Sequence, residues 1–395
     1  MDISREVAAL SSELVMLRRD FHQHPELGFE EFRTAERAAA YLESCGLESG
    51  RVSKTGVVSV IEGQGRGRAL LLRADMDALP IQEENDLPYR SVNPNKMHAC
   101  GHDGHTAMLL VAAKILSQHR DQFQGKVVLV FQPNEENAGA LPMIREGLLE
   151  DYPAEACLAL HLWPTIETGK IGISAGPVMA GMIQFALQIN GKGGHTGYPH
   201  LAVDPVLCAA DVIQSLQMIQ TREISVFQPT TIMIGKISGG TASNIVPDSV
   251  TMEGTARYLH EDAKDAGKNV LARIERLVSG ICSAYRTDHS LTVNSSHPAV
   301  VNDAKVVEIV RSAALQIVRD ERNIVRNVST TGEDFSEFST RIPGGFYFLG
   351  CGNGSEETSF PHHHPRFNID EEALKIGVEM HVRTAFEYLN KEDGP

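Results

Sequence analysis

Short apolar runs alternate with amphipathic stretches through the first half of the chain, and this alternation constrains the fold more than any other feature. The runs are rich in Leu and β-branched residues, are too short for helices, and cover residues 56–61, 68–75, 126–133 and 156–163. Amphipathic stretches at 4–24 and 33–47 have helical periodicity, and Gly46 ends the second. Strands separated by helices predict a largely parallel sheet covered by helices on both faces.

A different order of elements begins near Met182. Apolar periodicity predicts strands at 182–190, 230–238, 249–259 and 289–295, and helices at 202–223 and 261–285. This order, β-α-β-β-α-β, is that of a split ferredoxin-like unit. After Pro298 the alternation of helix and strand resumes. We therefore expect an α/β domain in two parts, 1–181 and 297–395, with a ferredoxin-like domain at 182–296 inserted between them.

Length and charge narrow the classes of protein. The chain has 395 residues, more than one hydrophobic core usually organises, and its formal net charge is −15. A nucleic acid or an anionic membrane would favour a basic face, so neither is an expected partner. No apolar run reaches the length of a membrane span, and the first residues carry no secretory signal. The six cysteines are too sparse for a disulfide scaffold, which favours the cytoplasm.

Acidic and imidazole side chains follow three of the expected strands. They are Asp75 and Asp77 after the second run, Asn134, Glu135 and Glu136 after the third, and His161 at the end of the fourth. Ligands of open α/β sheets bind beyond the carboxyl ends of the strands. The three strands therefore predict one site at one edge of the sheet.

The stretch HACGHDGH, residues 98–105, places Cys100, His102 and Asp103 directly before an apolar helix. Asp103 is expected to cap that helix, whose N-terminus would lower the pKa of the Cys100 thiol. Thiolate, imidazole and carboxylate together are the ligands that a zinc-like divalent ion selects. A buried cysteine beside solvated histidines is the alternative, and the acidic residues at the same edge favour the metal.

Glu135 and Glu136 leave a strand in succession, so their side chains should point in different directions. One can bind a metal while the other takes a proton from water, which is the division that metal hydrolases need. Two solvated surface carboxylates are the alternative, and their position after an apolar strand favours the site. The histidines at 362–364 offer one further ligand, and His195 lies in a glycine-rich turn whose importance depends on facing the other domain.

Two other motifs indicate different chemistry but lack the structural context that it needs. GISAG, residues 172–176, matches the nucleophile elbow of serine hydrolases, yet Pro177 and Gly181 follow where a helix is required. GQGRG, residues 63–67, looks like a phosphate-binding loop, yet it lies between two strands with no helix behind it, as in a hairpin turn.

Motifs along nearly the whole chain carry a family resemblance. They are FHQHPELGFEE, RADMDALP, MHACGHDGHTAMLL, FQPNEENAGA, HLWP, GKGGHTGYPH, SNIVPD, GTAR, GEDFSEF and HHPRFNIDE. With these motifs the chain resembles the aminoacylase and carboxypeptidase family of co-catalytic metallohydrolases, and most of all its amidohydrolase branch of hippurate, N-acyl-amino-acid and indole-acetyl-amino-acid hydrolases. The resemblance implies a catalytic α/β domain and an inserted ferredoxin-like lid that also dimerises, hence a homodimer or a tetramer.

The same resemblance implies roles for individual residues. The implied metal ligands are Cys100, His102, Glu136, His161 and His363, with His362 or His364 as alternatives to His363. Glu135 is the implied general base, and His195 is a lid histidine that stabilises a developing oxyanion. Asn244 and Arg257 would bind the substrate carboxylate, and Asp77 would orient a ligand. One or two divalent ions per subunit follow, zinc or manganese, with nickel and cobalt as alternatives.

The expected reaction is hydrolysis of an N-acyl amino acid, such as an N-acetyl or N-benzoyl derivative, to an acid and a free amino acid. A carboxypeptidase or dipeptidase with the same mechanism is the alternative, and the presence of Glu135 argues against a non-catalytic metal-binding protein. Relatives usually carry glycines and an alanine around the glutamate pair, whereas this chain has NEENAGA. Asn134 and Asn137 are therefore expected to change the wall of the pocket and, with it, the specificity.

Overall fold

The computed structural model describes residues 2–260 and 263–391, and the chain forms two compact units. Unit 1 contains the residues up to Val178, the segment Val301–Val328 and the residues from Glu337 onward. Unit 2 contains Met179–Val300 and Ser329–Ser336, so 329–336 groups with unit 2 although the expected boundaries put it in the larger domain. Residue 1 and residues 392–395, the ends of the expected larger domain, lie outside the described residues.

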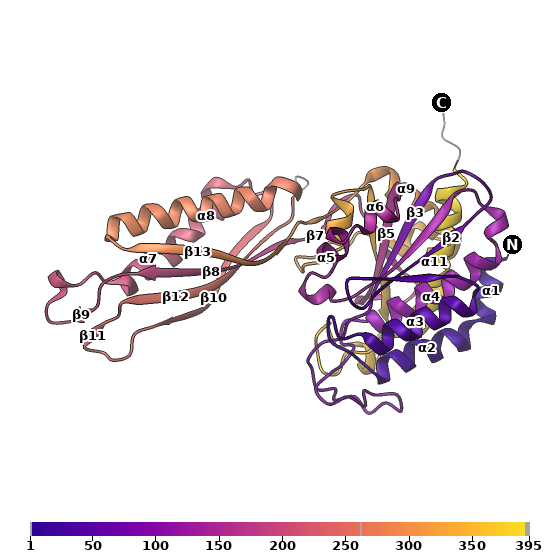
Figure 1. Ribbon diagram of the computed structural model, residues 1–395, viewed down its shortest axis with the longest axis horizontal. Coiled ribbons are helices and arrows are strands. Elements are labelled where there is room, and N and C mark those ends of the chain that lie inside the picture. The colour runs from indigo at the N-terminus through magenta and orange to yellow at the C-terminus, as the bar shows by residue number, and fades with distance from the viewer. Residues whose placement is uncertain (1, 261–262, 392–395) are drawn as a thin grey trace. The chain divides into compact units, whose positions relative to one another are not determined.

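Unit 1 is built on an eight-stranded sheet of order β1-β2-β4-β3-β5-β16-β6-β15 (Figure 1). Its strands are β1 (Ser49–Val52), β2 (Gly56–Glu62), β3 (Ala69–Asp75), β4 (Lys126–Gln132), β5 (Ala156–Glu167), β6 (Ile171–Gly172), β15 (Ile324–Val325) and β16 (Gly344–Gly352). The central pairs β4·β3, β3·β5 and β5·β16 are parallel, whereas β2 is antiparallel to β1 and β4. Every residue of β3 and β16 is buried, as expected for strands covered on both faces. The predicted largely parallel sheet is confirmed.

The helices of unit 1 enclose this sheet. They are α1 (Ile3–Ala9), α2 (Ser11–Gln23), α3 (Phe32–Ser44), α4 (His102–Gln118), α5 (Ala140–Arg145), α6 (Leu148–Asp151), α9 (Ala304–Val318) and α11 (Glu372–Leu389). Helix α4 packs on β3 and β5 and against α2 and α11, and its residues 102–113 are all buried. An apolar surface on every side is what a central helix requires. The single helix predicted at 4–24 is interrupted at Leu10, where α1 ends.

Unit 2 contains a four-stranded antiparallel sheet of order β10-β12-β8-β13. Its elements are β8 (Gly181–Asn190), β9 (Gly194–His195), α7 (Pro205–Met218), β10 (Thr230–Gly239), β11 (Ile245–Val246), β12 (Ser249–Tyr258), α8 (Ala263–Tyr285) and β13 (Asp288–His297). Alternate residues of β8 are buried on the face that packs against α7 and α8. The predicted order β-α-β-β-α-β is therefore confirmed. Residues 261 and 262, the start of the helix predicted at 261–285, lie outside the described residues.

Local sequence explains where α7 begins. Asp204 precedes it and accepts the backbone N–H of Val206 at 2.8 Å, and Pro205 occupies the first helical position. Both are favoured at a helix N-terminus. The helix predicted at 202–223 continues past Met218 as a π-helical turn, Ile219–Glu223. The chain passes between the units at four points, three of which lie in the short elements β7 (Gly176–Met179), β14 (Val300–Asn302) and α10 (Ser336–Ser339) and the fourth between Val328 and Ser329.

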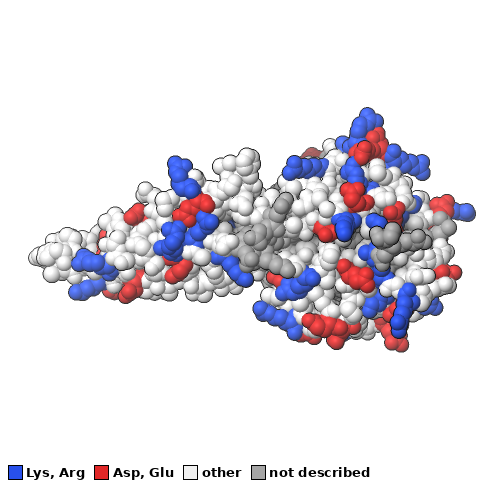
Figure 2. Space-filling view, turned by 90° about the horizontal axis from the view of Figure 1, so that it is seen from above, with Lys and Arg blue, Asp and Glu red and all other residues white. Residues whose placement is uncertain are grey.

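Among the helices of the described residues, none combines the length and the apolar character needed to cross a membrane. On the face of the molecule in Figure 2, acidic and basic side chains are interspersed within each unit. The net negative charge is therefore not gathered into one patch on that face.

Candidate metal centre

Strands β4, β3 and β5 are adjacent and parallel, so the segments that follow them meet at the same edge of the sheet. Strand β3 ends at Asp75 and β4 at Gln132, and the acidic candidates come directly after both. The sequence had suggested that His161 ends its strand. Strand β5 in fact continues to Glu167, so His161 lies within the strand. The edge still collects side chains from all three strands, because His161 is close to the candidates from α4.

Cys100 and His102 lie on either side of Gly101, the N-cap residue of α4. Gly101 has φ +93°, a left-handed conformation that glycine adopts without a steric cost. The Nδ1 of His102 donates to the backbone oxygen of Asp77 at 2.9 Å and lies 3.2 Å from its Oδ1. These contacts fix the imidazole by one nitrogen. The other nitrogen, Nε2, is buried and has no hydrogen-bond partner among the described residues.

Glu135 and Glu136 lie on a short 3-10 turn, Glu135–Asn137, between two residues with left-handed backbones. Asn134 has φ +55° and Ala138 has φ +64°, conformations that the surrounding contacts must hold in place. The backbone N–H of Glu136 donates to Asp77 Oδ2 at 3.1 Å. Its Oε1 is buried and finds no hydrogen-bond partner in the described part of the chain, although His363 Nε2 lies 3.2 Å away. The carboxylate of Asp77 thus contacts both candidate ligands.

Three candidate ligands form one set. The ligand atoms of Cys100, His102 and Glu136 all lie within 4.8 Å of one another. Leaving His102 Nε2 and Glu136 Oε1 buried without a hydrogen bond among the described residues is unfavourable, and a cation that shares their lone pairs removes this cost. Sulfur, imidazole nitrogen and carboxylate oxygen are donors that suit zinc and its neighbours in the periodic table. The residues present therefore fit a divalent metal ion.

Charges around the set also favour a cation. Burial raises the pKa of the Cys100 thiol well above its ordinary value, and the carboxylates of Glu136 and Glu135 raise it further. This direction is opposite to the lowering expected from the helix N-terminus, because burial and nearby negative charge favour the neutral thiol. Burial by itself would lower the pKa of His102, but the carboxylates of Asp75 and Asp77 raise it to about 10. Both shifts report an excess of negative charge at this edge, which a bound cation would offset.

The expected capping role of Asp103 is also wrong. Gly101 occupies the N-cap position of α4, and no side chain makes a capping hydrogen bond there. The buried Asp103 carboxylate instead accepts from Arg18 Nε at 2.8 Å and contacts His22 Nδ1 at 2.8 Å. His22 Nε2 in turn lies 3.1 Å from Glu83 Oε1. This buried network ties α2 to the first turn of α4.

Sequence reasoning assigned no role to Arg18 and His22, yet a signal was present. Both lie on the buried face of α2 with Leu14, Leu17 and Phe21. Charged or titratable residues on the apolar face of a helix are rarely buried without a partner. That pattern could have predicted a buried network, although not its partners.

His161 and His105 differ in what their nitrogens can do. The Nδ1 of His161 donates to the backbone oxygen of Leu162 at 2.8 Å, and its Nε2 lies 3.5 Å from Cys100 Sγ. The Nδ1 of His105 contacts Asp75 Oδ1 at 2.6 Å, and its Nε2 accepts the N–H of Leu162 at 2.9 Å. Both nitrogens of His105 are therefore engaged, whereas His161 keeps Nε2 for a ligand role.

Of the three consecutive histidines, two reach the centre. His362 forms a second set with Cys100 and His161 whose ligand atoms also lie within 4.8 Å, and its Nε2 donates to Leu162 O at 2.8 Å. His363 has φ +64° and lies beside Glu136, as described above. His364 instead accepts the N–H of Arg366 through Nδ1, and its ring stacks on another aromatic ring. The sequence left open which of the three histidines binds the metal, and it did not indicate that His362 lies close to Cys100.

The remaining predicted residues belong to unit 2. His195, in β9, is exposed and accepts the N–H of Gly197 through Nδ1 at 3.0 Å. Asn244 precedes β11, which pairs with β9, so His195 and Asn244 are neighbours within this unit. Arg257, in β12, is half-buried and donates from Nη1 to the backbone oxygen of Thr330 at 3.1 Å.

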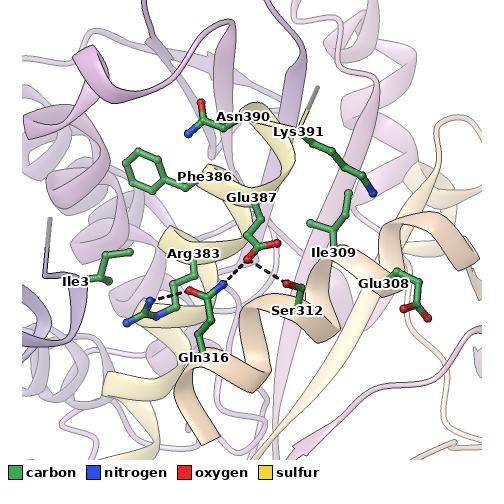
Figure 3. A pocket seen from close by; sticks show the side chains of 10 residues that line it. All are labelled: Ile3, Glu308, Ile309, Ser312, Gln316, Arg383, Phe386, Glu387, Asn390 and Lys391. Atoms are coloured by element: carbon green, nitrogen blue, oxygen red, sulfur yellow. Dashed lines mark hydrogen bonds between the residues drawn. The ribbon is translucent and has the colours of Figure 1, made fainter. Parts of the chain in front are cut away.

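A pocket of about 560 Å³ elsewhere in unit 1 contains none of the predicted site residues. It lies beside α9 and α11, and Figure 3 shows hydrogen bonds that link the lining side chains of Arg383, Gln316, Glu387 and Ser312. Arg383 donates to Gln316 at 3.0 Å, Ser312 donates to Glu387 at 3.1 Å, and Gln316 also donates to Glu387. Because these side chains hydrogen-bond to each other, they are less available to bind a ligand than the atoms of the Cys100 set that lack a hydrogen bond.

Comparison with known proteins places this geometry in a family. Residues 71–387 match Peptidase family M20/M25/M40. The chain is 37% identical to N-acetylcysteine deacetylase of Bacillus subtilis over 95% of this chain and 97% of that protein. It is 35% identical to thermostable carboxypeptidase 1 of Saccharolobus solfataricus over 98% of both chains.

A solved structure gives the same result. The crystal structure of the Bacillus subtilis YXEP protein, described as a dinuclear metal binding peptidase from the M20 family, has a TM-score of 0.83 and 34% identity. The match covers 97% of this chain and 99% of that chain. Matches in sequence and in structure over almost the whole length lead to one conclusion: the chain belongs to peptidase family M20/M25/M40, as a metal-dependent hydrolase.

Proposed function

We propose that the protein hydrolyses the amide bond of N-acyl amino acids, releasing a carboxylic acid and a free amino acid. The observation that carries this proposal is the set of Cys100, His102 and Glu136, in which His102 Nε2 and Glu136 Oε1 are buried without a hydrogen bond among the described residues, together with Glu135 on the same turn as Glu136. The similarity to an N-acetylcysteine deacetylase supports an acylated amino acid as substrate.

Five residues would hold one or two divalent ions: Cys100, His102, Glu136, His161 and His363. When bound, such an ion activates water and polarises the acyl carbonyl, with zinc or manganese as the proposed metal and nickel or cobalt as alternatives. Asp77 orients two of these ligands through its two carboxylate oxygens.

Glu135 is the proposed general base. It is adjacent in sequence to Glu136 and is not a member of the Cys100 set. It takes a proton from the attacking water and then delivers this proton to the amine that leaves, so one group serves both steps.

Three residues of unit 2 complete the proposal, and their roles rest on the family resemblance. His195 would donate to the oxygen of the tetrahedral intermediate. Asn244 and Arg257 would bind the carboxylate of the amino acid, a task for which the two-pronged guanidinium is suited. The Nη1 contact of Arg257 with Thr330 O fixes one part of the guanidinium.

A homodimer through unit 2, or a tetramer built from it, is part of the same proposal. Met233 and Ile237 lie on the edge strand β10 and are 59% and 56% exposed, which favours contact with another chain. A cytoplasmic location is proposed because all six cysteines are free thiols. Light scattering on the purified protein measures the mass, and a monomer at micromolar concentration would contradict the dimer.

The test of the function is a substrate panel. The protein is stripped with a chelator, restored with zinc, manganese, nickel or cobalt, and assayed on N-acetyl and N-benzoyl amino acids and on dipeptides. We expect faster release of amino acid from the acylated substrates and no turnover without metal. Faster cleavage of dipeptides would instead establish the peptidase, which the similarity to a thermostable carboxypeptidase makes the second candidate.

A further inference from the structure

The turn that carries Glu135 is held by a buried carboxylate on each side. On one side, Asp77 Oδ2 accepts the N–H of Glu136 at 3.1 Å. On the other side, Glu31 Oε1 accepts the N–H of Asn134 at 2.9 Å. Asp77 contacts a candidate metal ligand, whereas Glu31 contacts Asn134, the residue that precedes Glu135. Asp77 therefore holds the turn next to the proposed metal ligand Glu136, and Glu31 holds it next to the proposed base Glu135.

The side chain of Glu31 does not cap the helix that follows it. Glu31 occupies the N-cap position of α3, yet its side chain makes no capping hydrogen bond. Glu26 caps the helix instead, because its carboxylate accepts the N–H groups of Arg33 at 3.0 Å and Thr34 at 2.8 Å. The carboxylate of Glu31 is directed away from its own helix and toward the turn.

The contacts of Glu31 are few and specific. The residue is 0% exposed, and its Oε2 accepts the hydroxyl of Thr55 at 2.7 Å while Oε1 accepts from Asn134. Burial raises the pKa of Glu31 to about 7. A buried carboxyl group is costly, and an apolar side chain would fill the same space more favourably. An apolar side chain, however, could not accept the hydrogen bonds from Asn134 and Thr55 that Glu31 accepts.

The backbone that Glu31 contacts is left-handed. Asn134 has φ +55° and ψ +40°, a conformation that asparagine adopts more readily than most residues do. Gly28, from the same N-terminal segment, packs so closely on Asn134 that a Cβ on Gly28 would lie 1.8 Å from Asn134 Oδ1 and 2.9 Å from its Cβ. Gly28 therefore contacts the side chain of Asn134, and Glu31 contacts its backbone.

The side chain of Asn134 also contacts the turn. It is buried, lies against Gly28, and donates from Nδ2 to the backbone oxygen of Asn137 at 3.3 Å. These contacts brace the turn, and a role for Asn134 in the pocket wall stays a prediction.

We propose that Glu31 is a positioning residue for the reaction: by accepting the N–H of Asn134 it fixes the direction in which the Glu135 carboxylate leaves the turn. This inference rests on the proposed function, which makes Glu135 the base. Among the described residues, the side chain of Glu31 accepts hydrogen bonds from Asn134 and Thr55, and neither of these is a proposed metal ligand. A misplacement of a reacting group by about 1 Å can reduce turnover about 100-fold, so a remote contact of this kind can matter.

The test compares three variants. Glu31→Ala removes both contacts, Glu31→Gln keeps the shape and can accept from Asn134 and donate to Thr55, and Glu26→Ala damages the same segment without touching the turn. With one N-acyl amino acid and the restored metal, we expect Glu31→Ala to reduce kcat about 10- to 100-fold while KM and metal content change less than about twofold. Glu31→Gln should recover kcat to within about threefold, and Glu26→Ala should keep the wild-type kcat.

A second readout does not depend on any substrate. Hydrogen exchange of the peptide that covers residues 133–139 should become faster in Glu31→Ala and stay at the wild-type rate in Glu31→Gln and Glu26→Ala. If the wild-type protein cleaves no acylated amino acid, the proposed function fails, and the exchange measurement still decides whether Glu31 holds the turn. If Glu31→Ala does not fold, Glu31→Asp, one methylene shorter, takes its place with the same expected order.

Two outcomes overturn the inference. The first is a Glu31→Ala enzyme with wild-type kcat or wild-type exchange of the 133–139 peptide. The second is an equal loss of kcat in Glu31→Ala and Glu26→Ala, or a loss that matches a loss of bound metal, because either would show a general structural role.

Discussion

Replacing Asp77 with alanine should weaken metal binding about 10- to 100-fold and leave the fold intact. The carboxylate lies 3.2 Å from His102 Nδ1 and accepts the N–H of Glu136 at 3.1 Å, so one side chain orients two proposed ligands. Removing a partner that orients a metal-binding histidine typically costs this factor in affinity, because the ligand must then be ordered by the metal itself.

The contacts set the expected size of the effect. The backbone oxygen of Asp77 also accepts the His102 N–H, at 2.9 Å, and survives the substitution. We therefore assign about tenfold to the imidazole and about tenfold to the freed N–H of Glu136, together at most about 100-fold, or about 2.8 kcal/mol. Asp77→Asn should be intermediate, because its amide can accept at one contact but would present a donor to an N–H at the other.

A competition titration measures the affinity. Metal-free protein and a chromophoric chelator share a limiting amount of zinc, and the dissociation constant follows from the partition. Glu135→Ala is the matched control, because it removes a neighbouring carboxylate that the proposal leaves outside the metal site. An Asp77→Ala protein that binds zinc within about twofold of wild type would refute the reasoning, as would an equal loss in the control.

The remaining predictions concern the base, the third histidine ligand and the buried network. Glu135→Ala should keep its metal and lose activity by about 100-fold or more, measured as kcat beside metal analysis, and near-wild-type turnover would remove Glu135 from the mechanism. His363→Ala should lower the amount of bound metal more than His362→Ala, and the reverse order would transfer the ligand role to His362. Arg18→Met should destabilise the protein by about 3–5 kcal/mol in denaturant unfolding because it strands the buried Asp103, and Arg18→Met with Asp103→Leu should recover part of that loss.

The order of the elements could be predicted from local sequence. Apolar runs such as that of β3 have no room for solvent-facing polar residues, and all seven of its residues are buried. Alternation of such runs with amphipathic helices leaves few arrangements other than a covered, largely parallel sheet. The second order, from β8 to β13, was equally readable, because strand and helix periodicities differ over ten or more residues.

The residue that caps α4 and the pKa of Cys100 could not be predicted from local sequence. Asp103 stands where a short acidic side chain often caps a helix, and the local rule predicted that role. In the folded chain Arg18, 85 positions away, binds the carboxylate instead. Local sequence could not show this, because a buried guanidinium competes for the carboxylate only after α2 has packed beside α4. The thiol of Cys100 is another case, since burial and surrounding carboxylates decide its pKa.

By itself, the sequence determined which kinds of side chain would meet at one edge of the sheet, because parallel strands place their carboxyl ends together. Only the tertiary structure decided which buried atoms there lack a hydrogen bond among the described residues, such as His102 Nε2 and Glu136 Oε1. It also decided which distant group steadies the turn, since Glu31 and Asn134 are 103 positions apart. Periodicity is a property of neighbours along the chain, whereas hydrogen bonds between distant side chains depend on packing that no local window contains.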